Sequence, residues 1–344
     1  MQTTRIAVAA QPECAFALAK QWLQKGEVVA FPTETVYGLG ALAMDAQAVH
    51  RIFLAKGRPA DNPLIVHVAT LVQAQELSRR WNACAQKLAQ AFWPGPLSLI
   101  VEASKEIPTV VTADLDSVAL RMPSHPVALR LIRENGPIAA PSANRSGRPS
   151  PVTAQHVWED MQDKIPLILD GGMCEVGVES TVVDTRSGTP CILRPGGVTR
   201  EQILAVCGEC SVAQGVFEPV RGKAASPGML HRHYAPHGQA TLIWPGPHMV
   251  QQLCRGYDEA VAMGLRAVIL CSTQVKAQVG DRQAIACDTV GDMAHGLFTA
   301  LREADQRDAQ RILIQGVPVE ATGMAYMNRA LRAAGFDVQK EETE

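Results

Sequence analysis

The sequence is poor in the features that mark several common classes of protein. Aromatic residues make up 5% and charged residues 19% of the 344 positions, whereas hydrophobic residues make up 47%. No unbroken apolar run approaches the roughly 20 residues of a membrane-spanning helix. The formal net charge is -2, which does not indicate a globally basic nucleic-acid binder, although it is compatible with a local basic pocket. A globular protein of this length is expected to form two domains with sizeable cores.

Disulfides and targeting signals are not indicated either. The nine cysteines are odd in number and spread along the chain, as is typical of reduced thiols. Cys207 and Cys210 form the one close pair, and a zinc site would need two further ligands at matching spacing. The opening stretch "MQTTRIAVAAQPECAFALAK" lacks a basic segment followed by a long apolar one. We therefore expect no signal peptide, no membrane partner and a cytoplasmic location.

Several enzyme signatures are missing as well. The sequence contains no G-x-x-x-x-G-K-[ST], no H-E-x-x-H and no G-x-S-x-G motif. The spacing of Gly38, Gly40 and Ala43 imitates a dinucleotide-binding fingerprint, but these residues follow the preceding strand at a distance, so the match is weak. No paired carboxylates, nucleophile triad or metal-ligand set stands out, and no protein-bound metal is predicted.

Apolar periodicity and helix-terminating residues predict a strand-rich first part and a regularly alternating second part. In the first part we predict strands at 27–32, 63–68, 97–101, 118–123, 137–144, 167–172, 179–185 and 191–197, and helices at 12–25, 45–57, 72–92 and 126–136. Because several strands follow one another directly, residues 1–208 are expected to form a mixed sheet. Residues 209–238 show no clear period and are interpreted as a linker or functional loop. Residues 239–344 alternate strands and helices, which predicts a small α/β domain with a parallel sheet.

The stretch "LAKGRPADNPLIVHV" (54–68) combines cations with a stiff loop. Lys56 falls in the last turn of a predicted helix, where a cation suits the negative end of the helix dipole. Arg58 lies beyond the helix end and before Pro59, and Pro59 and Pro63 together hold the loop in one shape. Together with the Asn62 amide, these cations would suit an anion such as a phosphate, although Lys56 alone is explained by the dipole.

Two further loops leave the ends of predicted strands. "FPTETVYGLG" (31–40) carries the hydroxyls of Thr33 and Thr35 at a place where open α/β sheets bind ligands. "APSANRSGRPSP" (140–151) gathers three serines, an asparagine and two arginines, which suits phosphate oxygens. A solvated polar loop is the simpler reading of the second stretch.

Two arginines lie inside apolar strands. Arg121 in "SVALRMP" shares a face with Ala119, and Arg194 lies in "CILRPGG". A guanidinium at such a position needs an acidic partner or a ligand carboxylate. These two residues therefore indicate a site more strongly than surface arginines do.

Six stretches of the sequence, in this order, resemble the YrdC-type family, the threonylcarbamoyl-AMP synthases. The matching motifs are "FPTETVYGLG", "KGRPADNPLIVHV", "VALRMP", "APSANRSGRPSP", "GVESTVVD" and "LRPGG". The segment "SPGMLHRHYAP" and the alternating domain after it are similar to the long, two-domain form of the family. The resemblance implies a twisted mixed-sheet domain with a large basic cavity, joined to a small Rossmann-like α/β domain.

The resemblance also implies an activity and a set of binding residues. The family joins L-threonine, bicarbonate and ATP into threonylcarbamoyl-AMP and releases pyrophosphate, a nucleotidyltransferase reaction with ATP expected to carry Mg²⁺. Lys56 and Arg58 would clamp the phosphates and act as the catalytic residues. The rest of the nucleotide site would consist of Asn62, Ser117, Ser142, Asn144, Ser150, Arg194 and Tyr234. Threonine would be held by Thr35, His67, Arg121, the backbone at Ala140, and Ser180.

Partners and alternatives complete these expectations. The product would pass to a separate complex that modifies an adenosine of tRNA, while direct tRNA binding by this chain stays open. One alternative is a carbamoyltransferase with a related domain, although such chains are much longer and carry zinc-finger cysteines. Another is an RNA-binding module, which steep salt dependence of RNA binding would reveal.

Overall fold

The chain divides into two compact units in a computed structural model that describes residues 2–219 and 233–340. Of these residues, 2–146 and 150–216 form the first unit, and 147–149, 217–219 and 233–340 form the second. The predicted linker 209–238 is therefore described only in part, because residues 220–232 lie outside the described ranges. The predicted boundaries at 208/209 and 238/239 stay predictions.

A large mixed sheet organises the first unit. Its strands are β1 (Thr4–Ala7), β2 (Val29–Phe31), β3 (Gly38–Leu42), β4 (Ile65–His67), β5 (Ser78–Arg80), β6 (Leu97–Ala103), β7 (Ser117–Arg121), β8 (Ile138–Ala139), β9 (Leu167–Asp170), β10 (Thr181–Asp184), β11 (Cys191–Arg194) and β12 (Ser211–Val212). They form a 12-stranded sheet in the order β1-β9-β2-β3-β8-β4-β7-β6-β10-β11-β12, with β5 beside β6. β4 and β7 run parallel, whereas β8 pairs with both β3 and β4 in antiparallel fashion. The mixed sheet expected from the sequence is thus confirmed.

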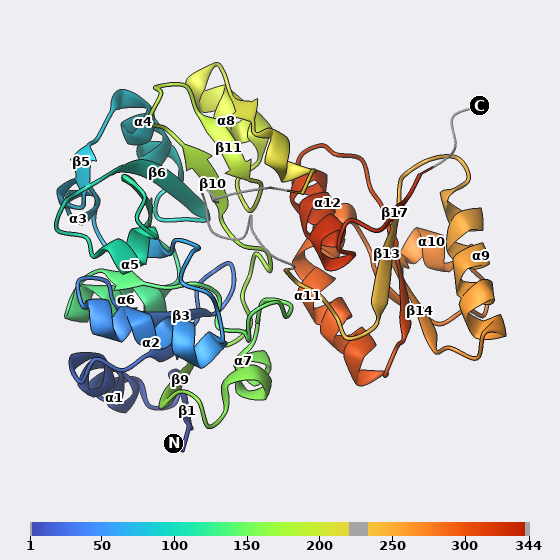
Figure 1. Cartoon of the computed structure of the whole chain (residues 1–344), viewed down its shortest axis with the longest axis horizontal. Coiled ribbons are helices and arrows are strands. Elements are labelled where there is room, and N and C mark those ends of the chain that lie inside the picture. Colours follow the sequence, from blue (N-terminus) through green and yellow to red (C-terminus); the bar gives the residue numbers. More distant parts are fainter. Residues whose placement is uncertain (1, 220–232, 341–344) are drawn as a thin grey trace. The chain divides into compact units, whose positions relative to one another are not determined.

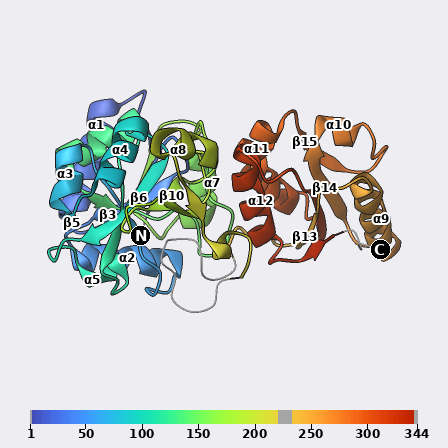
Figure 2. The same cartoon turned by 90° about the horizontal axis from the view of Figure 1, so that it is seen from above.

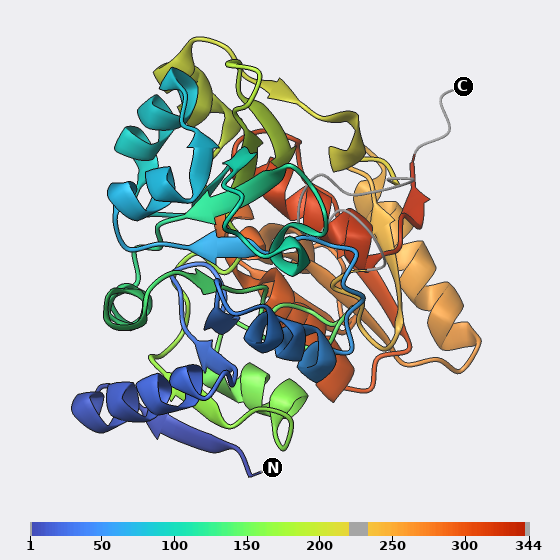
Figure 3. The ribbon, with the colours of Figure 1, turned by 60° about the vertical axis from the view of Figure 1, so that its left-hand side comes forward.

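Most helices of the first unit begin at a residue whose side chain accepts a backbone N–H of the first turn. They are α1 (Pro12–Gln24), α2 (Ala46–Lys56), α3 (Leu71–Glu76), α4 (Ala83–Phe92), α5 (Thr109–Thr112), α6 (Pro126–Asn135), α7 (Ala154–Met161) and α8 (Arg200–Cys207), followed by the 3-10 helix η1 (Gln214–Val216). The prediction of one helical region over 72–92 is wrong. Ser78 and Arg80 instead pair with β6, and the Asn82 side chain accepts the Ala85 N–H to start α4. α4 and α8 lie side by side although more than 100 residues separate them, as Figures 1 and 3 show.

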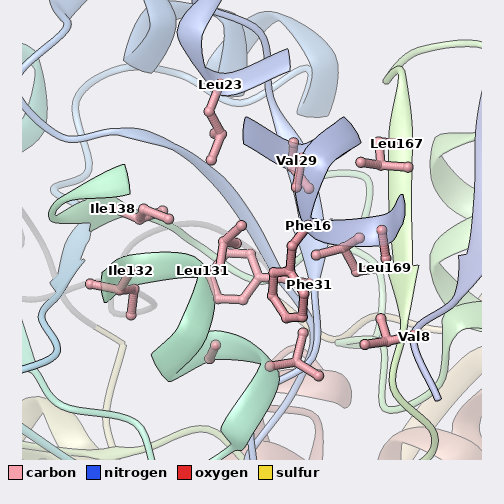
Figure 4. Close-up of a cluster of buried hydrophobic side chains, with 14 of the residues drawn as sticks. Val8, Phe16, Leu23, Val29, Phe31, Leu131, Ile132, Ile138, Leu167 and Leu169 are labelled. Atoms are coloured by element: carbon pink, nitrogen blue, oxygen red, sulfur yellow. The ribbon is translucent and has the colours of Figure 1, made fainter. Parts of the chain in front are cut away.

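The core of the first unit lies between α1, α6 and the β1-β9-β2 edge of the sheet (Figure 4). The fully buried side chains Leu23, Phe31 and Leu131 come from three of these elements. Each side chain of this size contributes about 1.5–3 kcal/mol on burial. The core therefore fixes the end of β2, which is followed by the polar loop that carries Thr33 and Thr35.

The second unit is a five-stranded parallel sheet covered by helices on both faces. Its elements are β13 (Gln239–Ile243), α9 (Met249–Ala262), β14 (Ala267–Ser272), α10 (Thr273–Lys276), β15 (Ala284–Cys287), α11 (Val290–Gln306), β16 (Arg311–Gln315), α12 (Thr322–Ala333) and β17 (Val338–Gln339). The strand order is β15-β14-β16-β13-β17 with every pair parallel. Figures 1 and 2 show α9 and α10 on one face and α11 and α12 on the other. The predicted alternating domain with a parallel sheet is confirmed.

The structure also bears on the weak dinucleotide-like spacing and on the stretch interpreted as a linker. Residues 38–42 form β3, antiparallel to β2, so Gly38 and Gly40 do not form a phosphate-binding turn. A Cβ on Gly40 would lie 2.6 Å from side-chain atoms of both Phe31 and Ile138, so close packing explains this glycine. The stretch 209–219 contains β12 and η1 and is not structureless. No helix in the described ranges is long and apolar enough to cross a membrane.

Candidate functional site

Lys56 lies at the end of α2 and points into the protein. Asp45 begins the helix by accepting the N–H groups of Gln47 and Ala48, and Gly57 ends it in the left-handed region with φ of 60°. The Lys56 ammonium donates to the carbonyl oxygens of Ser142 and Asn144, each at 2.5 Å. Burial, and secondarily the positive charge of Arg58, lowers the pKa of Lys56 below its usual range. Residues 140–151, "APSANRSGRPSP", are called the serine-rich loop below. Lys56 therefore fixes this loop to the end of α2.

Arg58 and Asn62 form the tight loop that follows. The Arg58 guanidinium donates to the carbonyl oxygens of Asn62 at 3.2 Å and Pro63 at 3.4 Å. The Asn62 side chain is 1% exposed, and its Oδ1 finds no hydrogen-bond partner among the described residues. A buried amide oxygen of this kind calls for a donor, which a bound ligand or water would supply.

The serine-rich loop is held at both ends by one residue of the "FPTETVYGLG" stretch. The Tyr37 N–H donates to the Pro151 carbonyl, and the Tyr37 carbonyl accepts the Ala143 N–H, both at 2.8 Å. Within the loop the Ser142 hydroxyl donates to Asn144 Oδ1 at 2.5 Å. These contacts bring Ser142 and Asn144 together with Lys56.

Ser150 closes the same loop against a carboxylate. Its hydroxyl donates to Glu179 Oε1 at 2.6 Å, and Ser150 is fully buried. Glu179 precedes Ser180, whose hydroxyl lies 2.7 Å from the Ser98 hydroxyl. The serine-rich loop is thus bonded to the residue that precedes Ser180, and Ser180 is predicted to bind threonine.

Arg194 reaches Ser180 from the adjacent strand. Its Nε and Nη2 donate to the Ser180 carbonyl at 3.2 and 3.0 Å, and Nη2 also reaches the Ser180 hydroxyl at 3.2 Å. Arg194 is 6% exposed. One predicted ATP residue and one predicted threonine residue are therefore in direct contact.

Arg121 has an acidic partner inside the protein. Its Nη2 lies 2.7 Å from Glu34 Oε1, and both side chains are 4% exposed. Arg121 Nε donates to the Gly95 carbonyl at 3.3 Å. The sequence required a partner or a ligand carboxylate for this guanidinium, and the protein itself supplies one carboxylate.

His67 lies beside Arg121 in the sheet, because the two residues are register partners on the parallel strands β4 and β7. Burial, and secondarily the Arg121 charge, lowers the pKa of His67 to about 3. The imidazole is therefore neutral at pH 7. Its Nδ1 is buried without a hydrogen-bond partner in the described ranges. Such a pKa makes His67 an inefficient general base and favours an orienting role.

Thr35 and Ala140 lie close to the same strands. The Thr35 hydroxyl lies 2.8 Å from the Thr33 hydroxyl, in a turn where both residues are buried. The Ala140 N–H already donates to the Ile65 carbonyl at 2.9 Å. A ligand contact at Ala140 would therefore involve its carbonyl oxygen.

Two predicted residues are not brought into this network. Ser117 lies at the start of β7, four residues before Arg121, and is buried. Tyr234 belongs to the second unit, where its ring lies 5.0 Å from that of Phe298 and the Arg329 guanidinium lies 6.0 Å from its centroid.

A basic groove lies beside the end of α2 in the first unit. Its volume is about 660 Å³, and its lining includes Arg51, Lys56, Arg145 and Lys164, with Glu27 as the acidic member. In the part of the chain that the structure describes, no three His, Cys, Asp or Glu side chains lie close enough to bind a metal ion.

Sequence reasoning missed three members of the network. Glu34, Ser98 and Glu179 each contact a predicted residue through a buried side chain. Glu179 lies in the motif "GVESTVVD", which by itself indicates no partner for its carboxylate. The signal for Glu34 was its position between Thr33 and Thr35 directly after an apolar strand, which drew attention only to the hydroxyls.

Comparison with known proteins covers nearly the whole chain. A family model described as "Telomere recombination" matches residues 21–196, and one described as "Threonylcarbamoyl-AMP synthase, C-terminal domain" matches residues 198–335. The chain is 44% identical to the threonylcarbamoyl-AMP synthase of Pyrococcus abyssi over 94% of its own length and 95% of the relative. It is 45% identical to that of Bacillus subtilis, over 93% and 92%.

A solved structure agrees with the fold of the chain. The crystal structure of P. abyssi Sua5 complexed with L-threonine matches with a TM-score of 0.91 and 41% identity, covering 99% of both chains. The match includes both units, so the two-domain architecture is shared.

Proposed function

The chain belongs to the threonylcarbamoyl-AMP synthase family, and from that premise we propose how its first unit holds the substrates of the family's reaction. The reaction joins L-threonine, bicarbonate and ATP into threonylcarbamoyl-AMP and pyrophosphate. The buried network around β4, β7 and the serine-rich loop supports one site with a threonine end and a nucleotide end.

The threonine end is assigned to Arg121, His67, Thr35, Ser180 and the Ala140 carbonyl. Arg121 binds the α-carboxylate, because a guanidinium matches a carboxylate with two parallel N–H donors. His67 stays neutral and uses its buried Nδ1 to orient the substrate. The hydroxyls of Thr35 and Ser180 supply further polar contacts.

The nucleotide end is assigned to the helix end and the serine-rich loop. Arg58 and Asn62 contact phosphate oxygens, while Lys56 contributes charge and holds the loop in shape. Arg194 and the polar side chains Ser117, Ser142, Asn144 and Ser150 complete this end. The family resemblance adds Tyr234 as a further residue of the nucleotide site.

The chemistry needs positioned charge more than a nucleophilic side chain. The threonine amine and bicarbonate form a carbamate with loss of water. A carbamate oxygen then attacks the α-phosphorus of ATP, and pyrophosphate leaves. Cations beside the phosphates stabilise the charge that builds up in this step, and positioning of the two reactants supplies much of the remaining acceleration.

Three further assignments rest on the family. Mg²⁺ enters bound to the phosphates of ATP, as it commonly does in nucleotide sites. The product passes to a separate tRNA-modifying complex. The chain works in the cytoplasm, where that reaction sequence and reduced cysteines are compatible.

The contact between Arg194 and Ser180 carries this proposal, because it joins the predicted threonine and nucleotide residues in one buried network. The test incubates the protein with ATP, Mg²⁺, L-threonine and ¹³C-bicarbonate and detects the product by mass spectrometry. A threonylcarbamoyl adenylate that carries one ¹³C label is expected. Absence of that product, together with tight and steeply salt-dependent RNA binding, would favour the RNA-binding alternative.

A further inference from the structure

The turn between β2 and β3 holds Glu34 from two sides. The Thr33 hydroxyl accepts the N–H groups of Thr35 and Val36 at 3.2 Å and donates to the Val36 carbonyl at 2.6 Å. The Glu34 carbonyl accepts the Val176 N–H at 2.7 Å. The backbone of Glu34 is therefore fixed, which restricts the direction of its side chain.

The Glu34 carboxylate is tied down at both oxygens. Oε1 lies 2.7 Å from Arg121 Nη2, and Oε2 accepts the Ser124 N–H at 3.1 Å. On its other side the Arg121 guanidinium donates from Nε to the Gly95 carbonyl. The guanidinium is thus held at two edges by groups that belong to separate loops.

Donors of Arg121 remain available to a second carboxylate. A guanidinium carries five N–H donors, and a bidentate contact with a carboxylate uses two of them. Among the described residues, Arg121 contacts the Gly95 carbonyl through Nε and the Glu34 carboxylate through Nη2, so further N–H donors of the guanidinium are left for a ligand. Glu34 therefore balances the buried charge without using up the fork of the guanidinium.

We propose that Glu34 is a positioning residue for threonine, holding the Arg121 guanidinium in the orientation that binds the substrate carboxylate. This inference rests on the proposed function, since it takes Arg121 as the threonine-binding residue. Without the carboxylate, the guanidinium would be a buried cation free to turn toward other acceptors, at a cost in carboxylate affinity.

The test measures the KM for L-threonine and for ATP in pyrophosphate release by the full chain and its Glu34→Gln variant. The Gln amide is neutral, and its NH2 group replaces one carboxylate oxygen, so it would face a donor in place of an acceptor, either Arg121 Nη2 or the Ser124 N–H. We expect the KM for threonine to rise roughly tenfold, the effect of one lost charge-assisted contact, and the KM for ATP to stay at the wild-type value.

Glu13→Gln is the matched control. Glu13 contacts Arg130 through both oxygens, at 2.9 and 2.7 Å, between α1 and α6, which carry none of the assigned site residues. This variant removes a carboxylate from an arginine pair in the same unit, and both KM values are expected to stay unchanged.

A second variant guards against misfolding. Glu34→Asp keeps the charge but withdraws it by one methylene, so it should unfold close to the wild-type midpoint and still raise the KM for threonine. A KM for threonine that is unchanged or lower in both Glu34 variants would overturn the inference. An equal rise of the KM for threonine and the KM for ATP would also overturn it, because it indicates a structural role. If the wild-type chain itself shows no threonine-dependent release, the proposed function fails instead.

Discussion

Replacing Lys56 by Met tests the join between α2 and the serine-rich loop. Met keeps the length and apolar stem of the side chain but removes the ammonium, so little cavity is created. The carbonyl groups of Ser142 and Asn144 then lose the donor that lies 2.5 Å from each. Leaving a buried acceptor unsatisfied costs about 1–3 kcal/mol, so the first unit should lose about 2–6 kcal/mol of unfolding free energy.

Urea unfolding followed by tryptophan fluorescence measures this loss. Four of the five tryptophans, at positions 22, 81, 93 and 158, lie in the first unit, so the signal reports mainly on that unit. The unfolding midpoint should fall while the slope stays constant. In addition, amides of residues 142–146 should exchange with deuterium faster, and ATP should bind more weakly.

Lys164→Met provides the control for Lys56→Met. Lys164 is exposed and donates to one carbonyl, that of Asp160, at 3.2 Å. Its replacement should change the unfolding free energy by less than about 0.5 kcal/mol. If Lys56→Met behaved like this control in both stability and ATP affinity, the assigned role of Lys56 would be refuted.

Three other predictions address separate parts of the chain. The pKa of His67 is about 3 in the folded chain and about 6.5 when unfolded, so the unfolded chain binds more protons between these pH values. The unfolding free energy should therefore fall, by up to about 1.4 kcal/mol per pH unit, as the pH is lowered through this window. In the His67→Gln variant the urea midpoint should depend less on pH. Asp305→Ala removes the acceptor of the His237 N–H at 2.6 Å and should speed deuterium exchange at that amide, whereas unchanged exchange would refute the contact. Cys14 is exposed and should react first with a thiol reagent at pH 8, while Cys174, whose pKa burial raises to about 12, should react only after unfolding; rapid labelling of Cys174 in the native chain would contradict this.

Local signals predicted the elements that depend on local interactions. The helix 45–57 was predicted from its cap Asp45 and its terminating Gly57, and both residues act so in the structure. The prediction of one helix over 72–92 was wrong because β5 forms by pairing with β6, and the apolar periodicity of 72–92 gives no information about that pairing. The same holds for β3, whose glycines suit close packing against Phe31 and Ile138.

The candidate site divides in the same way. Arg121 was singled out because a charge in an apolar strand needs a partner, and that reasoning uses only the neighbouring residues. Its partner Glu34 comes from a turn 87 positions earlier in the chain, since 121 minus 34 is 87, and only the fold brings the two together. The contact of Lys56 with Ser142 and Asn144 was equally hidden, because its acceptors are backbone carbonyls, which every residue type possesses.

The central claim is tested most directly by measuring pyrophosphate release from ATP in the presence of Mg²⁺. The measurement is made with L-threonine alone, with bicarbonate alone, with both, and with neither. The account predicts release only when both are present, because the carbamate that attacks the α-phosphorus contains atoms from each. Release that is indifferent to threonine, or no release under any condition, would contradict the assignment of one site that joins threonine to the nucleotide.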